Sequence, residues 1–118
     1  MTQVRVGVIG ASGRGGMAKH WHDPDGRSVG VGAADVSEGA LDWFKKNVNE
    51  KGFTTQDHRE LLDRDDVDAI AVMSPDFTHE QYVCDAFAAG KHVFSEKPMA
   101  ITTAGCDRML KAWVDSGN

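Results

Sequence analysis

The stretch VGVIGASGRGGM, residues 6–17, constrains this chain more than any other, because five of its twelve residues are glycine. Glycine loses much backbone entropy on folding, so a cluster indicates positions where a side chain does not fit. An apolar, β-branched run over residues 4–9 precedes the cluster and predicts a strand covered on both faces. The glycines therefore fall at a turn between this strand and a helix predicted over residues 15–21.

Four more strand patterns follow, each separated from the next by a helical pattern. The strands are predicted at residues 28–34, 53–55, 67–73 and 92–94. The helices between them have amphipathic spacing and start at residues suited to capping: Ser37, Asp57, Thr78, and Thr102 or Thr103. Gly52 is expected in a left-handed conformation after the second helix, and Gly90 is expected to end the fourth.

Strands that alternate with helices predict an α/β fold with a parallel sheet and right-handed crossovers. We expect a doubly wound Rossmann fold of three layers, α/β/α, with strand order 3-2-1-4-5. The last helix is expected to bury Met109, Leu110, Trp113 and, at its margin, Val114.

Composition places the 118 residues among ordinary globular domains, with 41% apolar and 26% charged residues. The net charge of -5, without a basic tract beyond Lys45 and Lys46, argues against nucleic acid or an anionic membrane as partner. No apolar run approaches the roughly 18–20 residues of a membrane span, and no secretory pattern opens the chain.

Cys84 and Cys106 lack metal-ligand spacing, which favours two buried thiols in a cytoplasmic protein over a disulfide. The histidines share no ligand pattern, so no metal site is expected.

The glycine turn has the form of a phosphate-binding motif. Gly10, Ala11, Ser12, Gly13, Arg14 and Gly15 follow the pattern G-x-G-x-x-G with Ser12 in place of the second glycine. In a doubly wound sheet, ligands bind beyond the carboxyl ends of the strands where the winding reverses, here between the strands ending at Ile9 and Met73. These six residues are predicted to bind a dinucleotide through bare backbone amides, and the alternative is a flexible turn without a ligand.

Asp35 stands at the end of the second predicted strand, 25 positions after Gly10. An acidic side chain there accepts hydrogen bonds from the adenine-side ribose of NAD. The 2′-phosphate of NADP would meet this carboxylate, and neither Val36 nor Ser37 offers a compensating positive charge. Asp35 therefore predicts NAD, with NADP disfavoured; the alternative is a solvated carboxylate at a strand end.

Two segments in the second half carry a family resemblance. Ser74-Pro75-Asp76-Phe77-Thr78-His79 and Ala89-Gly90-Lys91-His92-Val93-Phe94-Ser95-Glu96-Lys97-Pro98 together resemble the signature of the Gfo/Idh/MocA family of oxidoreductases. The resemblance implies that Ser74, Pro75 and His79 line the ribose and nicotinamide side of the cofactor, that Glu96 holds the nicotinamide ribose, and that Lys97 is the catalytic residue facing the reacting carbon. It also makes the bond before Pro98 a candidate cis peptide.

The residues themselves leave two of these roles open. A lysine at the carboxyl end of a strand is placed to polarise an alcohol or carry its proton, but Lys97 also fits a surface lysine paired with Glu96. His79 falls in the first turn of a helix, where packing, solvent exposure and ligand binding are all compatible with its position.

The resemblance implies an NAD-dependent dehydrogenase of a sugar, polyol or related compound. Relatives continue into a second, substrate-binding domain, so residues 1–118 are expected to form the dinucleotide-binding domain alone and to turn over slowly or not at all. A sixth strand, expected after the last helix in a doubly wound sheet, has no counterpart in the sequence pattern. We therefore expect an open sheet edge, which favours homo-oligomers. Two alternatives remain: a dinucleotide-sensing module without catalysis, and a glycosidase domain that recycles NAD in place.

Overall fold

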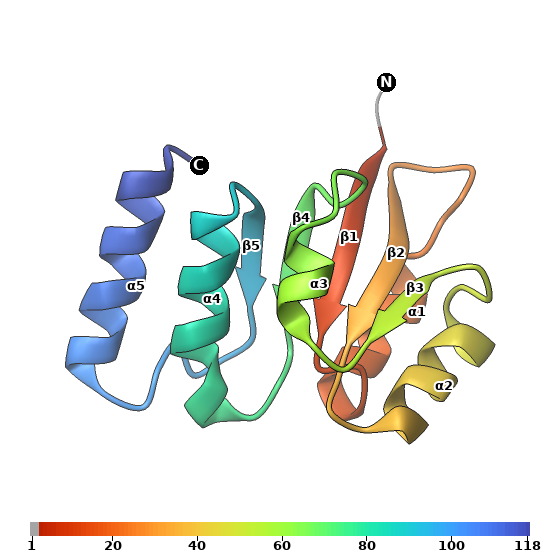
Figure 1. Cartoon of the computed structure of the whole chain (residues 1–118), viewed down its shortest axis with the longest axis horizontal. Coiled ribbons are helices and arrows are strands. Elements are labelled where there is room, and N and C mark those ends of the chain that lie inside the picture. Colours follow the sequence, from red (N-terminus) through yellow and green to blue (C-terminus); the bar gives the residue numbers. More distant parts are fainter. Residues whose placement is uncertain (1–2) are drawn as a thin grey trace.

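A computed structural model describes residues 3–118, so Met1 and Thr2 of the expected domain lie outside the described residues. The predicted α/β fold is confirmed: a five-stranded parallel sheet has the order β3-β2-β1-β4-β5 (Figure 1). The strands are β1 (Val4–Ile9), β2 (Ser28–Ala34), β3 (Phe53–Thr55), β4 (Ala69–Val72) and β5 (His92–Ser95). The helices are η1 (Gly13–Met17), α1 (Ala18–Trp21), α2 (Glu38–Asn47), α3 (His58–Leu62), η2 (Asp76–Thr78), α4 (His79–Ala88) and α5 (Thr103–Ser116).

Two apolar clusters, one on each face of the sheet, hold these layers together. Val8 pairs in register with Ala33 of β2 and Ala71 of β4, and all three belong to the cluster under α1 and α2. The next residue, Ile9, lies in the other cluster, with side chains from α3, α4 and α5. Successive side chains of a strand point to opposite faces, so the unbroken apolar run of β1 serves both cores.

Three local predictions were wrong at helix ends. The helix predicted at residues 15–21 starts as the 3-10 helix η1 and becomes α-helical at Ala18. Gly52 does not have a positive φ; it is glycine because a Cβ there would lie 2.7 Å from the Phe44 ring. Thr78 does not cap α4, because the preceding turn η2 gives it helical backbone angles. Its hydroxyl lies 2.6 Å from the Ser74 hydroxyl instead.

The other predicted caps are confirmed. Side-chain oxygens of Ser37, Asp57 and Thr102 accept hydrogen bonds from backbone N–H groups in the first turns of α2, α3 and α5. Each cap satisfies one of the N–H groups that a helix start leaves without a partner.

The last helix buries less than its sequence predicts. Met109 is buried, but Leu110, Trp113 and Val114 are exposed, so the prediction was wrong for these three. The reason is placement: α5 lies beside α4 and beyond the edge strand β5, so it does not cover the sheet (Figure 1). Consequently, α5 buries only the narrow face that packs against α4 and leaves the rest of its apolar stripe exposed.

The two cysteines also differ from expectation. Cys84 and Cys106 are half-buried instead of fully buried, and both thiols are free. Partial burial raises the pKa of the Cys84 thiol. No helix within residues 3–118 is both long and apolar enough to cross a membrane.

An ion pair joins the start of β1 to the start of β4. Both carboxylate oxygens of Asp68 accept hydrogen bonds from the Arg5 guanidinium, and one also accepts from the Arg5 backbone N–H at 2.9 Å. These bonds stabilise the ionised carboxylate and lower the pKa of Asp68 to about 2.

The Arg5–Asp68 pair predicts an acid-dependent contribution to stability. Because the pKa of Asp68 is lower in the folded than in the unfolded state, the contribution is present above about pH 4 and is lost as the pH falls towards about 2. Asp68→Asn should therefore lower the free energy of unfolding by about 1 kcal/mol near neutral pH, after allowance for solvent screening. Urea titrations across this range should show the difference from wild type shrinking with acid.

The matched control is Asp65→Asn. The Asp65 carboxylate accepts no hydrogen bond from any residue in the part of the chain that the structure describes. This substitution should change stability little at any pH in the series. An Asp68→Asn penalty that stays constant down to the lowest pH would contradict the role assigned to the pair.

Candidate functional site

Two adjoining cavities open at the carboxyl ends of the strands. The first, of about 310 Å³, is called here the Tyr82 cavity, and the second, of about 390 Å³, the Lys97 cavity. Five residues line both: Gly10, Asp35, Val36, Ser74 and Pro75. The two cavities therefore form one continuous crevice across the ends of β1, β2 and β4, at the switch point of a doubly wound sheet.

The glycine turn runs along this crevice with no room for larger residues at two positions. Gly10 has a φ of +91°, and a Cβ there would lie 2.6 Å from the Ser74 backbone nitrogen. A Cβ on Gly15 would overlap the carbonyl oxygen of Gly10. Gly13 has a φ of +57° but open space around it. The turn thus needs glycine for close approach at Gly15, for conformation at Gly13, and for both reasons at Gly10.

Asp35 is tied to the glycine turn. One carboxylate oxygen accepts a hydrogen bond from the Ala11 N–H and the other from the Ser37 N–H, both at 2.9 Å. The side chain therefore anchors both the turn after β1 and the approach to α2. Sequence spacing predicted a ligand-binding role for the Asp35 carboxylate, but it gave no sign of this anchoring contact.

The structure brings together most of the residues singled out from the sequence. Those that line the Lys97 cavity are Gly10, Ser12, Gly13, Arg14, Asp35, Ser74, Pro75, Glu96 and Lys97. Ala11 and Gly15 are buried within the turn and line neither cavity.

Glu96 and Lys97 follow β5 and close one end of the crevice. One Glu96 carboxylate oxygen accepts from the Lys97 backbone N–H at 2.8 Å, and the other lies 3.7 Å from the Arg14 guanidinium. Among residues 3–118, no carboxylate forms an ion pair with the Lys97 ammonium group. The alternative of a Lys97–Glu96 side-chain pair is therefore not what the structure contains. The Lys97–Pro98 bond is cis, as the resemblance suggested.

His79 lies behind the crevice instead of in it. Its side chain is 1% exposed and lines neither cavity. The Nδ1 atom lies 2.6 Å from the Pro98 carbonyl oxygen, and Nε2 lies 2.8 Å from the Ser74 carbonyl oxygen. Of the roles left open by the sequence, the packed one matches this geometry, and the ring links the two segments that carry the family signature.

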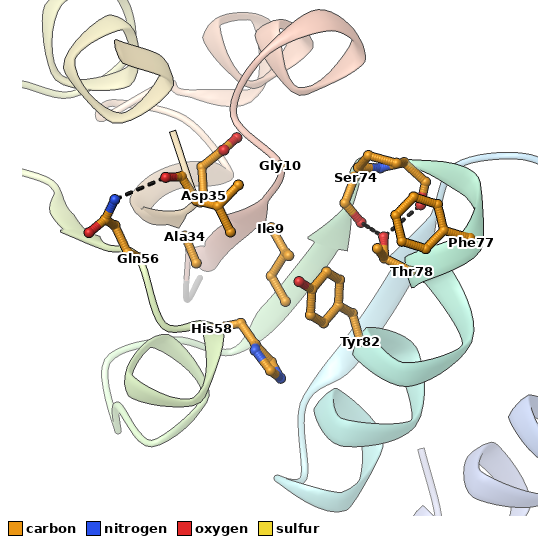
Figure 2. A pocket seen from close by; sticks show the side chains of 12 residues that line it. Ile9, Gly10, Ala34, Asp35, Gln56, His58, Ser74, Phe77, Thr78 and Tyr82 are labelled. Atoms are coloured by element: carbon orange, nitrogen blue, oxygen red, sulfur yellow. Dashed lines mark hydrogen bonds between the residues drawn. The ribbon is translucent and has the colours of Figure 1, made fainter. Parts of the chain in front are cut away.

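The Tyr82 cavity contains residues that sequence analysis did not select. Val36 and Phe77 line it with side chains that are 79% and 71% exposed, one after β2 and the other after β4. Tyr82 of α4 and His58 of α3 also line it (Figure 2). Large apolar side chains exposed beside a crevice suit contact with a ligand, and only the folded structure shows that Val36 and Phe77 are exposed there.

The crevice has the chemistry for an elongated ligand that carries an anion at its centre. Bare backbone amides at the glycine turn suit an anionic group, the Asp35 carboxylate suits hydroxyl groups, and the apolar walls suit a flat ring. Within residues 3–118, no group of three or more His, Cys, Asp or Glu side chains is arranged to hold a metal ion.

Comparison with known proteins agrees with this geometry. Residues 4–118 match the Gfo/Idh/MocA family model, described as an oxidoreductase family with an NAD-binding Rossmann fold. The chain is 36% identical over 115 residues to an inositol 2-dehydrogenase of Agrobacterium fabrum, covering 97% of this chain and 34% of the relative. It is 38% identical over 111 residues to a glycosyl hydrolase family 109 protein of Shewanella sp. strain ANA-3, covering 86% of this chain and 24% of that protein.

A solved dehydrogenase structure has the same fold over nearly all of this chain. Scyllo-inositol dehydrogenase from Lactobacillus casei, solved with bound NAD(H) and scyllo-inositol, superposes with a TM-score of 0.90 at 26% identity. The match covers 99% of this chain and 34% of that structure. The chain thus spans about a third of the length of the dehydrogenases it matches.

The glycine geometry predicts unequal effects for two similar substitutions. Gly15→Ala forces a Cβ into the Gly10 carbonyl and should lower the free energy of unfolding by about 3 kcal/mol. Gly13→Ala meets open space and only the left-handed backbone penalty, so it should cost about 1 kcal/mol. Urea unfolding followed by tryptophan fluorescence measures both; equal losses would show that the close approach at Gly15 is not limiting.

Proposed function

Since this chain belongs to the Gfo/Idh/MocA oxidoreductase family, we propose that it is the NAD-binding part of a dehydrogenase acting on a sugar or polyol. The observation that carries the proposal is the crevice itself, in which bare amides and one carboxylate lie between an apolar cavity and an exposed lysine. The family match and the inositol dehydrogenase relatives support the choice of cofactor and of substrate class.

The cofactor lies along the crevice with its diphosphate at the glycine turn. The Ser12 N–H has no acceptor among residues 3–118, and the first N–H groups of a helix have no partner within it. These donors bind the diphosphate oxygens. The adenosine half occupies the Tyr82 cavity between Val36 and Phe77, and the nicotinamide half occupies the Lys97 cavity.

Asp35 selects NAD over NADP in this arrangement. Each Asp35 carboxylate oxygen accepts one backbone hydrogen bond and has lone-pair capacity for another, so Asp35 can keep its contacts to Ala11 and Ser37 while it binds the ribose hydroxyls. A 2′-phosphate would face this negative charge. No lysine or arginine is among the residues that line the Tyr82 cavity, so nothing there offsets the repulsion.

Lys97 transfers a proton to or from the reacting oxygen of the substrate. Bound NAD supplies the hydride acceptor, C4 of its nicotinamide ring. Lys97 is exposed at the nicotinamide end. In oxidation, its neutral amine would accept the proton of the substrate hydroxyl as the hydride leaves for the cofactor; in reduction, its ammonium form would donate a proton to the carbonyl oxygen. Glu96 binds the nicotinamide ribose with a carboxylate already oriented by the Lys97 backbone N–H.

His79 is a positioning residue in this scheme. It contacts the carbonyl oxygens of Ser74 and Pro98, so it sets the distance between the loop after β4 and the segment that carries Lys97. The distance that His79 sets matters because a small displacement of a reacting group strongly reduces the reaction rate. The 118 residues alone are expected to bind NAD weakly and to turn over slowly or not at all, because hydride transfer needs a substrate held close to the nicotinamide and this chain covers 34% of its dehydrogenase relative.

A second candidate is a glycosidase that recycles NAD within its site. The 38% identity to a glycosyl hydrolase family 109 protein supports it. Both enzymes would use the same cofactor crevice, so the distinction rests on the reaction catalysed by the full-length protein.

The cofactor proposal predicts a selectivity carried by Asp35. The 118-residue chain should bind NAD at least about tenfold more tightly than NADP, by isothermal titration calorimetry. Asp35→Ala should bring the two affinities close together. Because Asp35 also anchors Ala11, the variant will weaken both dinucleotides, so the ratio of the affinities is the decisive measurement. A wild-type ratio near one would refute the assignment of Asp35.

The catalytic proposal is tested on the full-length protein that contains this chain. It should reduce NAD with at least one member of a panel of inositols and aldoses. Lys97→Met should lower kcat by about 10²- to 10⁴-fold while leaving the affinity for NAD within about twofold. The matched control, Lys111→Met on α5, should leave kcat unchanged, since among residues 3–118 Lys111 pairs with Asp115 alone.

Other outcomes separate the alternatives. Release of nitrophenol from aryl glycosides without net NADH formation would favour the glycosidase. Preserved NAD binding with neither activity would favour a dinucleotide-sensing module and contradict the dehydrogenase.

A further inference from the structure

Tyr82 presents the one polar side-chain group of the Tyr82 cavity that has no protein partner among residues 3–118. The other polar side chains lining this cavity are engaged: Asp35 with Ala11 and Ser37, Gln56 with the Val36 carbonyl, His58 with Asp85, and Ser74 with Thr78. Figure 2 shows the Tyr82 hydroxyl directed into the space beside Ile9, while the His58 ring points away from it.

The tyrosine ring is held from below. It lies against the His58 ring, with the two ring centroids 4.5 Å apart. His58 is fixed in turn, because its Nε2 atom lies 2.8 Å from a carboxylate oxygen of Asp85, one turn along α4 from Tyr82. The hydroxyl is thus aimed by a closed chain of contacts between α3 and α4 before any ligand arrives, which lowers the entropy cost of using it.

The surroundings of the hydroxyl narrow the class of group it binds. Exposed Val36 and Phe77 flank the cavity, and Ile9 and Ala34 add apolar surface. Away from Asp35, the cavity is an apolar slot in which the Tyr82 hydroxyl is the one side-chain donor–acceptor without a protein partner among residues 3–118, and such a slot suits a flat heteroaromatic ring with nitrogen atoms on its edge. A second sugar in that part of the cavity would leave most of its hydroxyl groups without partners.

We infer that the Tyr82 hydroxyl hydrogen-bonds the edge of the purine of the bound dinucleotide and so determines affinity for its adenosine half. This inference rests on the proposed NAD site and assigns one further residue within it. The nicotinamide half, in the Lys97 cavity, does not contact Tyr82.

The test uses the two halves of the cofactor separately. The 118-residue chain and its Tyr82→Phe variant are titrated with NAD, with adenosine monophosphate and with nicotinamide mononucleotide. Removing the hydroxyl should weaken adenosine monophosphate and NAD by the same factor, about threefold to tenfold. Binding of nicotinamide mononucleotide should not change. Ser116→Ala, which removes a hydroxyl on α5 that contacts only the neighbouring backbone, is the matched control and should affect none of the three.

A spectroscopic measurement observes the contact directly. Tyr82 is the single tyrosine of the chain, so labelling tyrosine with ¹³C at the ζ position gives one NMR signal. This signal should shift on addition of adenosine monophosphate and stay in place with nicotinamide mononucleotide. The unfolding midpoint of Tyr82→Phe should equal that of wild type, because the hydroxyl has no protein partner within residues 3–118.

The outcomes distinguish this inference from the proposed function. If wild type binds NAD but Tyr82→Phe binds adenosine monophosphate equally well, the inference falls and the NAD site stands. If the variant loses affinity for both half-molecules alike, the effect is general and the inference also falls. If wild type binds neither NAD nor adenosine monophosphate, both proposals fall.

Discussion

The close approach of the glycine turn to the loop after β4 is the contact on which the rest of the site depends. A Cβ on Gly10 would lie 2.6 Å from the Ser74 nitrogen, and one on Gly15 would overlap the Gly10 carbonyl. With hydrogen in those places, the chain can leave β1, turn within a few residues and return as η1 and α1 over the sheet. The same tight path places backbone amides at the mouth of the crevice, so the packing requirement and the ligand requirement are met by the same residues.

Side chains that bind backbone groups then fix the two walls of the crevice. Asp35 holds the glycine turn through the Ala11 N–H, and His79 holds the loop after β4 against Pro98 through two carbonyl oxygens. Both contacts join segments far apart in the sequence. Because these ties are made between groups of the chain itself, they support both walls of the crevice, and less of the interaction energy with a ligand is needed to organise them.

The sequence was sufficient for features that depend on local patterns. Five apolar runs separated by amphipathic stretches predicted the strand order, and the spacing from Gly10 to Asp35 placed the carboxylate at the crevice. It failed where the answer depends on a distant neighbour. The apolar stripe of α5 predicted burial of Leu110 and Trp113, but it could not show that both side chains stay about half exposed because α5 lies beyond the edge strand. The sequence pattern assigned Tyr82 no site role, and only the folded arrangement shows its hydroxyl directed into a cavity.

The two ends of the crevice differ in structure, in keeping with the proposal that one binds adenosine and the other holds the reacting nicotinamide. The Tyr82 cavity is built from residues between Ile9 and Tyr82, so this chain supplies all of its described lining. At the other end, Lys97 is exposed, and its ammonium group forms no ion pair with a carboxylate among residues 3–118. Binding energy from a remote, non-reacting part of a ligand can be used to position the part that reacts. An adenosine half held firmly by its own cavity would therefore fix the nicotinamide beside Lys97, whatever substrate the remainder of a full-length protein brings to it.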